Sequence, residues 1–190
     1  MNIIKKLSSI FLFFTVFYEV SAMDDQGRER GDYYYRLGFT YRDQGKLDDA
    51  IAQYKLAIQN DTYVGDCYYR LGGIYRDQGR LDDAIAQYKL AIQNDTHVGD
   101  CYYRLGFIYR DQGKLDDAIA QYKLAIQNDT YVGDSHYRLG NIYERLLEIQ
   151  ENPQHFREAL YQYKLAYENT SDGDFKREIG EVMQRCDPIL

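Results

Sequence analysis

The chain has 190 residues, of which 30 are acidic and 23 basic, so its formal net charge at pH 7 is −7. This balance argues against nucleic acid and anionic membrane surfaces as ligands, because both are bound through an excess of Lys and Arg. Three cysteines, an odd number, leave at least one thiol without an intramolecular partner. The length is sufficient for one domain with a real core, provided that the core is elongated.

Residues 1–22 have the features of a cleavable signal peptide. Two lysines precede an apolar run over residues 10–18, and small residues up to Ala22 stand where a signal peptidase would cut, before Met23. A membrane anchor is the alternative, but the run is about half of the roughly 20 apolar residues that a spanning helix needs. No cysteine follows the run, which argues against a lipid anchor. We therefore expect an exported protein, periplasmic or secreted, with no membrane insertion after cleavage.

After a short lead over residues 23–30, the chain contains three tandem 34-residue copies, at residues 31–64, 65–98 and 99–132. Apolar residues recur twice in each copy with i, i+3, i+4, i+7 spacing, which predicts two helices with one apolar face each. In the second copy the first helix has Tyr68, Leu71, Gly72 and Tyr75, and the second has Ala84, Ile85, Tyr88, Ala91 and Ile92. Each copy is therefore predicted to be a helical hairpin.

Within the hairpin, Gly72 and Ala84 are predicted to be small because the two helices approach each other closely there. Gly79 allows a left-handed turn between the helices, and Asp82 is a predicted N-cap of the second helix. One hairpin cannot bury its own apolar face, so the copies must stack on one another.

This pattern resembles the tetratricopeptide repeat (TPR) family over residues 31–171. It departs from the family in two ways: tyrosine replaces the usual Trp and Phe, and Thr62, Thr96 and Thr130 stand where the family usually has proline. The resemblance implies an all-α fold, a right-handed solenoid of antiparallel helix hairpins with a C-terminal capping helix. It also implies a non-enzymatic protein interaction module or scaffold.

The fourth copy, residues 133–171, has seven additional residues between its two helices. Seven residues make two helical turns, so residues 144–151 and the Asn152-Pro153 turn can lengthen both helices without rotating their packed faces. A longer hairpin is the simpler interpretation, and a projecting docking tab is the alternative. Residues 172–190 begin the pattern again and are predicted to form a capping half-repeat helix that ends at Pro188.

The resemblance further implies that the first helices line a concave groove. Four positions per copy lie opposite the packed stripe at 100° per residue, and they combine aromatic and arginine side chains, which are enriched at binding hot spots. We therefore predict that a peptide or helix of a partner protein binds across Asp32, Tyr35, Phe39, Arg42, Asp66, Tyr69, Gly73, Arg76, Asp100, Tyr103, Phe107, Arg110, Asp134, Tyr137, Asn141 and Glu144.

Two alternatives apply to this groove. The i,i+4 pairs Asp32–Arg36, Asp66–Arg70, Asp100–Arg104 and Asp134–Arg138 would stabilise a solvated helix without any ligand. The copies are also nearly identical, so duplication alone could account for the recurrence of Tyr and Arg. The clamp of Lys and Asn that holds a partner's terminal carboxylate in some TPR domains is absent, because tyrosine stands in place of the lysine.

We expect no enzymatic activity, no cofactor and no metal. His97, His136 and His155 do not recur and have no metal-ligand spacing, and no phosphate loop or nucleophile elbow occurs. Four Asn-x-Ser/Thr sites fall where second helices end, which favours helix C-caps over glycan acceptors: Asn60, Asn94, Asn128 and Asn169.

We expect a monomer that binds another protein. The alternative is a self-associating structural protein of the cell envelope or surface, since near-identical repeats can stack end to end between molecules. Cys67 and Cys101 occupy equivalent positions of adjacent copies. Packed helices lie about 8–10 Å apart, beyond the usual Cα separation of a disulfide, so we expect no bond between them.

Overall fold

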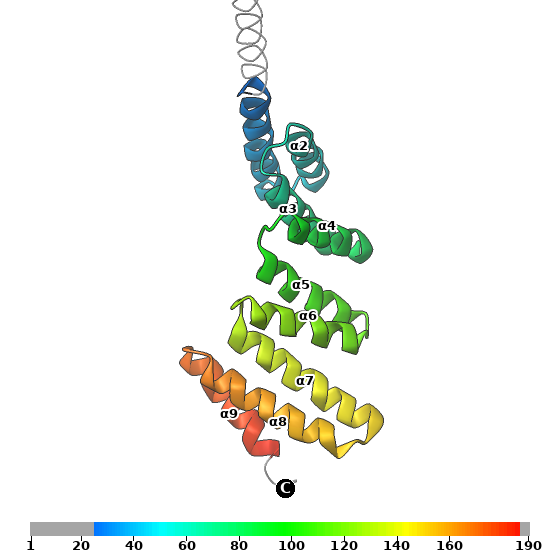
Figure 1. Ribbon diagram of the computed structural model, residues 1–190, viewed down its shortest axis with the longest axis vertical. Coiled ribbons are helices and arrows are strands. Elements are labelled where there is room, and N and C mark those ends of the chain that lie inside the picture. The colour runs from blue at the N-terminus through cyan, green and yellow to red at the C-terminus, as the bar shows by residue number, and fades with distance from the viewer. Residues whose placement is uncertain (1–24, 187–190) are drawn as a thin grey trace, which may run out of the picture.

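The computed structural model describes residues 25–186, in which every regular element is a helix (Figure 1). A helix over residues 25–43 is followed by α2 (Leu47–Gln59), α3 (Val64–Asp77), α4 (Leu81–Gln93), α5 (Val98–Asp111), α6 (Leu115–Gln127), α7 (Val132–Gln150), α8 (Pro153–Glu168) and α9 (Gly173–Cys186). The predicted signal peptide and Pro188 lie outside the described residues.

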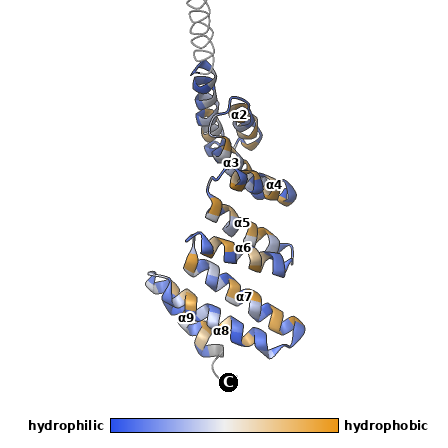
Figure 2. Cartoon of the chain, viewed as in Figure 1, coloured by the Kyte–Doolittle hydropathy of each residue, from blue (hydrophilic) through white to orange (hydrophobic). Residues whose placement is uncertain are grey.

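Successive helices pair as hairpins, and the hairpins stack in chain order along the long axis of the molecule (Figure 1). Figure 2 shows both apolar and polar residues along each labelled helix. The buried residues recur at helical spacing, as Ala84, Tyr88 and Ala91 do in α4, so one side of each helix faces the core. The core consequently runs along the stack, from Ala50 near one end to Val182 near the other. The all-α solenoid predicted from the sequence is confirmed.

The two helices of each hairpin meet where a glycine lies under a tyrosine ring. A Cβ placed on Gly38, Gly72, Gly106 or Gly140 would come within 2.7, 2.8, 2.8 or 2.5 Å of the ring of Tyr54, Tyr88, Tyr122 or Tyr163, respectively. All four tyrosines are completely buried, and so is Ala84. Only glycine permits this separation, which confirms the close approach predicted at Gly72.

The opposite end of each hairpin is closed by threonine. The backbone N–H groups of Thr62, Thr96 and Thr130 donate to the carbonyls of Ala57, Ala91 and Ala125 at 3.1, 3.0 and 3.0 Å. A Cβ on Gly31, Gly65 or Gly99 would overlap the same threonine side chains. Proline has no N–H to donate, so this chain gains a hydrogen bond where the family pattern usually has proline.

The turns agree with the sequence in two respects and differ in one. Gly79 has φ +74°, the predicted left-handed conformation, and Asn94 is the C-cap of α4, with its amide donating to the Leu90 carbonyl at 2.8 Å. The prediction of Asp82 as an N-cap is wrong: Arg80 is the N-cap and Asp82 lies inside the first turn. A carboxylate there still favours the positive end of the helix dipole without capping it.

The seven additional residues of the fourth copy lengthen both of its helices. Helix α7 has 19 residues and α8 has 16, compared with 14 in α5 and 13 in α6. Glu151 takes a left-handed conformation at the turn, and the side chain of Asn152 caps α8 by accepting from the Gln154 N–H at 3.0 Å. Helix α9 then packs on α8 through Ile179 and Val182, which are both buried.

Cys67 and Cys101 are free and completely buried thiols. The prediction that they form no disulfide with each other is confirmed. Burial raises the pKa of each thiol to about 12, because the thiolate would lose its hydration. The same cause raises the pKa of the Tyr54 and Tyr88 hydroxyls to about 12.

Adjacent glycines in α3 provide a matched test of the glycine–tyrosine contact. We expect Gly72→Ala to lower the free energy of unfolding by about 1–3 kcal/mol, because its methyl group must displace the Tyr88 ring. At Gly73 the nearest atom to an added Cβ is 3.9 Å away. Gly73→Ala should therefore raise the free energy of unfolding by about 0.5–1 kcal/mol. Urea denaturation would measure both, and equal effects would contradict the contact.

The buried thiols and phenols should make the fold sensitive to alkali. An acid whose pKa is raised in the folded state stabilises that state below its unfolded pKa and loses this contribution as the pH rises toward the folded value. We expect the melting temperature to fall between about pH 9 and pH 12. In a Cys67→Ser, Cys101→Ser variant the decline should begin about one pH unit higher, where tyrosine starts to titrate. Circular dichroism melts would show both, and a melting temperature constant up to pH 11 would refute the expectation.

Candidate functional site

The predicted groove residues lie on the first helix of each copy, namely the helix over residues 25–43, α3, α5 and α7. We call this surface the first-helix face. All the predicted residues are half-buried, so none belongs to the core and none extends freely into solvent. The face brings aromatic side chains together within copies, with Tyr35 and Phe39 at a ring separation of 5.3 Å and Tyr103 and Phe107 at 5.0 Å.

Aromatic side chains from the turns also join the first-helix face. Tyr63, His97 and Tyr131 stack on Tyr35, Tyr69 and Tyr103 with ring centroids 4.5, 4.4 and 4.5 Å apart. Each of the three turn residues has φ +48°, a conformation that is costly for a residue with a side chain. Sequence reasoning missed them because they precede the helices. Their signal was an aromatic residue at the same place in every full copy.

The arginines at the i+4 positions do not follow the predicted helix pairing. Arg36 pairs with Asp32 at 2.9 Å, but this is the only one of the four pairs that forms among the described residues. Arg70 instead lies over the Phe39 ring at 4.5 Å, and Arg138 lies over Phe107 at 4.8 Å. The interpretation of these pairs as stabilisers of a solvated helix is therefore wrong for the second, third and fourth copies.

Each of these displaced arginines faces a tyrosine hydroxyl of the preceding copy. Arg104 donates to the Tyr69 hydroxyl at 2.9 Å, and Arg70 and Arg138 lie at the hydroxyls of Tyr35 and Tyr103. Within the part of the chain that the structure describes, none of the three guanidinium groups has a carboxylate within 4.0 Å. The site therefore contains positive charges without counter-ions.

The carboxylates that sequence reasoning assigned to these arginines have other partners. Asp66 lies 2.8 Å from a ring nitrogen of His97, and Asp100 contacts the Tyr131 hydroxyl. By contrast, the predicted groove arginines Arg42, Arg76 and Arg110 each pair with the next residue in the chain, Asp43, Asp77 and Asp111, at 2.8, 2.7 and 2.7 Å. Arg70 and Arg104 are thus better placed than Arg42 and Arg76 to attract an anion.

A cavity of about 180 Å³ opens on the first-helix face at Gly73. The first and third copies have Phe39 and Phe107 at this position, and both rings pack against the buried tyrosine of their own hairpin, Tyr54 and Tyr122. Glycine leaves that space empty in the second copy. The cavity is lined by Arg42, Leu47, Tyr69, Arg70, Gly73, Ile74, Arg76, Asp77, Tyr88 and Arg104.

Two polar groups of this lining lack partners. The hydroxyl of the buried Tyr88 is the nearest atom to an added Cβ on Gly73, and it has no hydrogen-bond partner among the described residues. The same holds for Nε of Arg70. The Tyr88 hydroxyl is a neutral donor at physiological pH, and burial raises its pKa further, to about 12. Four arginines and one aspartate surround these donors, which suits a carboxylate.

The fourth copy uses its predicted groove residues internally. Asn141 and Glu144 both accept from the Tyr163 hydroxyl, at 2.7 and 2.6 Å. Tyr137 donates to Glu178 of α9 at 2.8 Å. Asn141, Glu144 and Tyr137 are therefore engaged within the chain, whereas the Tyr88 hydroxyl and Nε of Arg70 in the second copy have no partner among the described residues.

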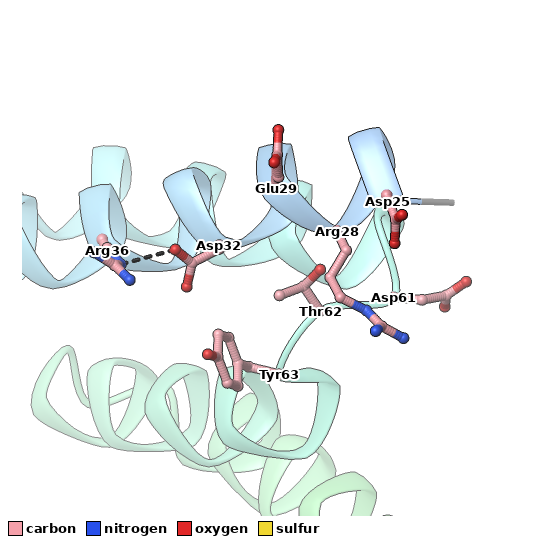
Figure 3. A pocket seen from close by; sticks show the side chains of 8 residues that line it. All are labelled: Asp25, Arg28, Glu29, Asp32, Arg36, Asp61, Thr62 and Tyr63. Atoms are coloured by element: carbon pink, nitrogen blue, oxygen red, sulfur yellow. Dashed lines mark ion pairs between the residues drawn. The ribbon is translucent and has the colours of Figure 1, made fainter. Parts of the chain in front are cut away.

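A larger cavity of about 670 Å³ lies at the N-terminal end of the described chain (Figure 3). The carboxylates in its lining outnumber the guanidinium groups, and one of the two arginines, Arg36, is paired with Asp32. The lining residues are Asp25, Arg28, Glu29, Asp32, Arg36, Asp61, Thr62 and Tyr63. Through Asp32 and Tyr63 this acidic cavity adjoins the first-helix face, where it contrasts with the positive lining at Gly73.

Over residues 25–186, no three His, Cys, Asp or Glu side chains are grouped so that they could hold a metal ion. None of the described helices has the length and apolar character that crossing a membrane requires. The features that stand out on the first-helix face are its aromatic stacks and the arginine-lined cavity.

The fold and this face define a helical-repeat solenoid of the kind that contacts other proteins. A family model described as tetratricopeptide repeat matches residues 35–97, and one described as TPR repeat matches residues 106–146, together more than half of the chain. The chain belongs to the tetratricopeptide repeat family, whose members serve as protein interaction modules. No curated protein matches it.

Several solved structures share this fold. A crystal structure of MamA protein is 26% identical, with a TM-score of 0.59, and the match covers 83% of this chain and 90% of that one. A structure of MamA AMB-1 is 20% identical over 85% of this chain and 86% of that one, with a TM-score of 0.60. A tetratricopeptide repeat protein from Parabacteroides merdae ATCC 43184 is 19% identical, with a TM-score of 0.69 and coverage of 84% and 61%.

Proposed function

We propose that this protein binds a segment of a partner protein along the first-helix face without converting it chemically. The cavity at Gly73 receives an acidic side chain of that segment. The observation that carries the proposal is the convergence of Arg70, Arg104 and the unpartnered Tyr88 hydroxyl on one cavity. Burial of unpaired polar groups costs free energy, and a bound carboxylate would supply the missing acceptor.

The surroundings of the cavity suit a protein segment. Stacked aromatic rings offer large contact areas with few rotatable bonds, so little entropy is lost on binding. Arg70 is already held against the Phe39 ring, and Arg104 is held by the Tyr69 hydroxyl. Because these guanidinium groups are ordered before the ligand arrives, binding them costs less than ordering free side chains.

A single carboxylate suits the electrostatics better than a polyanion does. The four arginines at the cavity are local, whereas the chain as a whole carries a net charge of −7. A nucleic acid would bring many phosphates against this acidic surface, but an acidic side chain in an otherwise apolar segment meets only the positive cavity.

Gly73→Phe is the most selective test, because phenylalanine occupies the equivalent position in two neighbouring copies and the fold accepts it there. The ring should fill the cavity and cover the Tyr88 hydroxyl. In selections from a random peptide display library, we expect the wild-type protein to enrich Asp and Glu at one position. That preference should fall at least about tenfold in Gly73→Phe and in Arg70→Gln, Arg104→Gln, a loss of ~1.4 kcal/mol or more.

The matched control for that experiment is Arg145→Gln, which removes an exposed arginine from a later part of α7. It should select the same peptides as the wild type, and circular dichroism should be unchanged in every variant. If the wild type selects no acidic preference, or if all variants select alike, the proposed function of the cavity is wrong.

We also propose that the protein acts outside the cytoplasm, as the signal-like segment over residues 1–22 suggests. Expression of the full chain in its native host should give a mature protein that begins at Met23 and is found in the periplasm or medium. N-terminal sequencing and intact mass would measure this. A protein that retains Met1 and remains in the cytoplasmic fraction would rule out export.

A further inference from the structure

Helix α9 repeats the first-helix pattern, but its glycine has no tyrosine above it. A Cβ placed on Gly180 meets no atom within 4 Å. In the four hairpins the equivalent glycine meets a tyrosine ring from the second helix at 2.5–2.8 Å. Gly180 therefore marks the place where a fifth second helix would pack, and none of the described residues fills it.

A cavity of about 560 Å³ at this place is lined by residues of α8 and α9. These two helices lie at the C-terminal end of the stack (Figure 1). Most of its lining side chains are apolar or aromatic. They include Leu160, Tyr161, Lys164, Tyr167, Gly180 and Met183. In each of the four hairpins the second helix covers the glycine of its own first helix, which is the face of α9 that this cavity leaves open.

Two of these lining residues differ from those of the other copies. Tyr161 stands where the first three copies have alanine, and Tyr167 stands where they have isoleucine. Tyr161 is 56% exposed and Tyr167 is 44% exposed, although burial of large apolar side chains stabilises a protein. Duplication cannot account for residues that occur in one copy alone. Tyrosine is enriched at the centres of protein interfaces, so these two exposed side chains favour a surface that another protein covers.

We propose that this cavity binds an amphipathic helix of a partner protein, which completes a fifth hairpin in trans. The four second helices of this chain define the chemistry of that helix: alanine, then tyrosine four residues later, then alanine three residues after that, as in Ala50, Tyr54 and Ala57. The tyrosine ring covers Gly180, and the two alanines allow the backbones to approach. The site is independent of the cavity at Gly73, which lies in α3.

The probe is a peptide of this chain's own second helix, residues 81–93, held helical by a side-chain staple between the exposed positions of Lys89 and Gln93. Fluorescence anisotropy would measure its binding to the mature full-length protein. We expect saturable binding that weakens at least about tenfold when the peptide tyrosine is replaced by alanine. The protein variant Gly180→Leu should weaken binding by a similar factor, since its side chain fills the place of the ring.

Gly27→Leu is the matched control, because an added Cβ at Gly27 also meets no atom within 4 Å. This variant should bind the peptide as the wild type does, and both variants should keep the wild-type helical circular dichroism. Absence of peptide binding, or equal binding by Gly180→Leu, overturns the proposal. These results leave the peptide selections at Gly73 unaffected.

Two further outcomes would assign the site to another occupant. Sedimentation that shows a dimer of the wild-type protein, dispersed by Gly180→Leu, would place a second copy of this chain there and overturn the partner helix. Peptide binding that appears only after deletion of residues 187–190 would mean that the chain's own end fills the cavity. That result would also overturn the proposal of a partner helix.

Discussion

The contact between a glycine of the first helix and a buried tyrosine of the second determines the rest of this structure. It sets the distance between the two helices of each hairpin, and repetition of that distance sets the stack. The same tyrosine also reaches the first-helix face, because the ring of Tyr88 lies under Gly72 while its hydroxyl ends beside Gly73. In the fourth copy the hydroxyl of Tyr163 is held by Asn141 and Glu144. Tyr88 therefore contributes both to core packing and to the polar groups of the first-helix face, so a substitution at Gly72 or Gly73 affects both.

Stacking of the copies also decides where the arginines lie. An exposed i,i+4 ion pair on a helix stabilises by about 0.3–0.5 kcal/mol. A partly desolvated guanidinium over an aromatic ring reaches about 2 kcal/mol, which outweighs such an exposed ion pair. Arg70 and Arg138 have such a ring in the preceding copy, Phe39 and Phe107. Arg36 belongs to the first copy and keeps its ion pair with Asp32. The arginines without counter-ions are therefore a consequence of repetition.

The sequence predicted the features that depend on one copy alone, and it did not predict the contacts between adjacent copies. Helix periodicity and the small residues Gly72 and Ala84 were sufficient for the hairpin and its close approach, because those features depend on residues within 34 positions. Arg70 contacts Phe39 of the preceding copy instead of Asp66 on its own helix. That contact depends on how adjacent copies pack, and the residue pattern of one helix does not predict it. The stack of His97 on Tyr69 depends on a left-handed backbone that propensities disfavour for a side-chain-bearing residue. Arg80 in the N-cap position, which Asp82 was expected to fill, shows that turn geometry can override capping preference.

Two of the places where this solenoid departs from a uniform stack are glycines without an aromatic ring above them. At Gly73 the missing ring would come from the same position of the repeat, and its absence leaves a cavity beside the Tyr88 hydroxyl. At Gly180 the missing ring would come from a second helix, and its absence leaves an apolar cavity. The first vacancy therefore favours an anionic acceptor, and the second favours an aromatic side chain on a helix. Because the copies are nearly identical, the side chains that surround each empty place indicate which ligand would fit it.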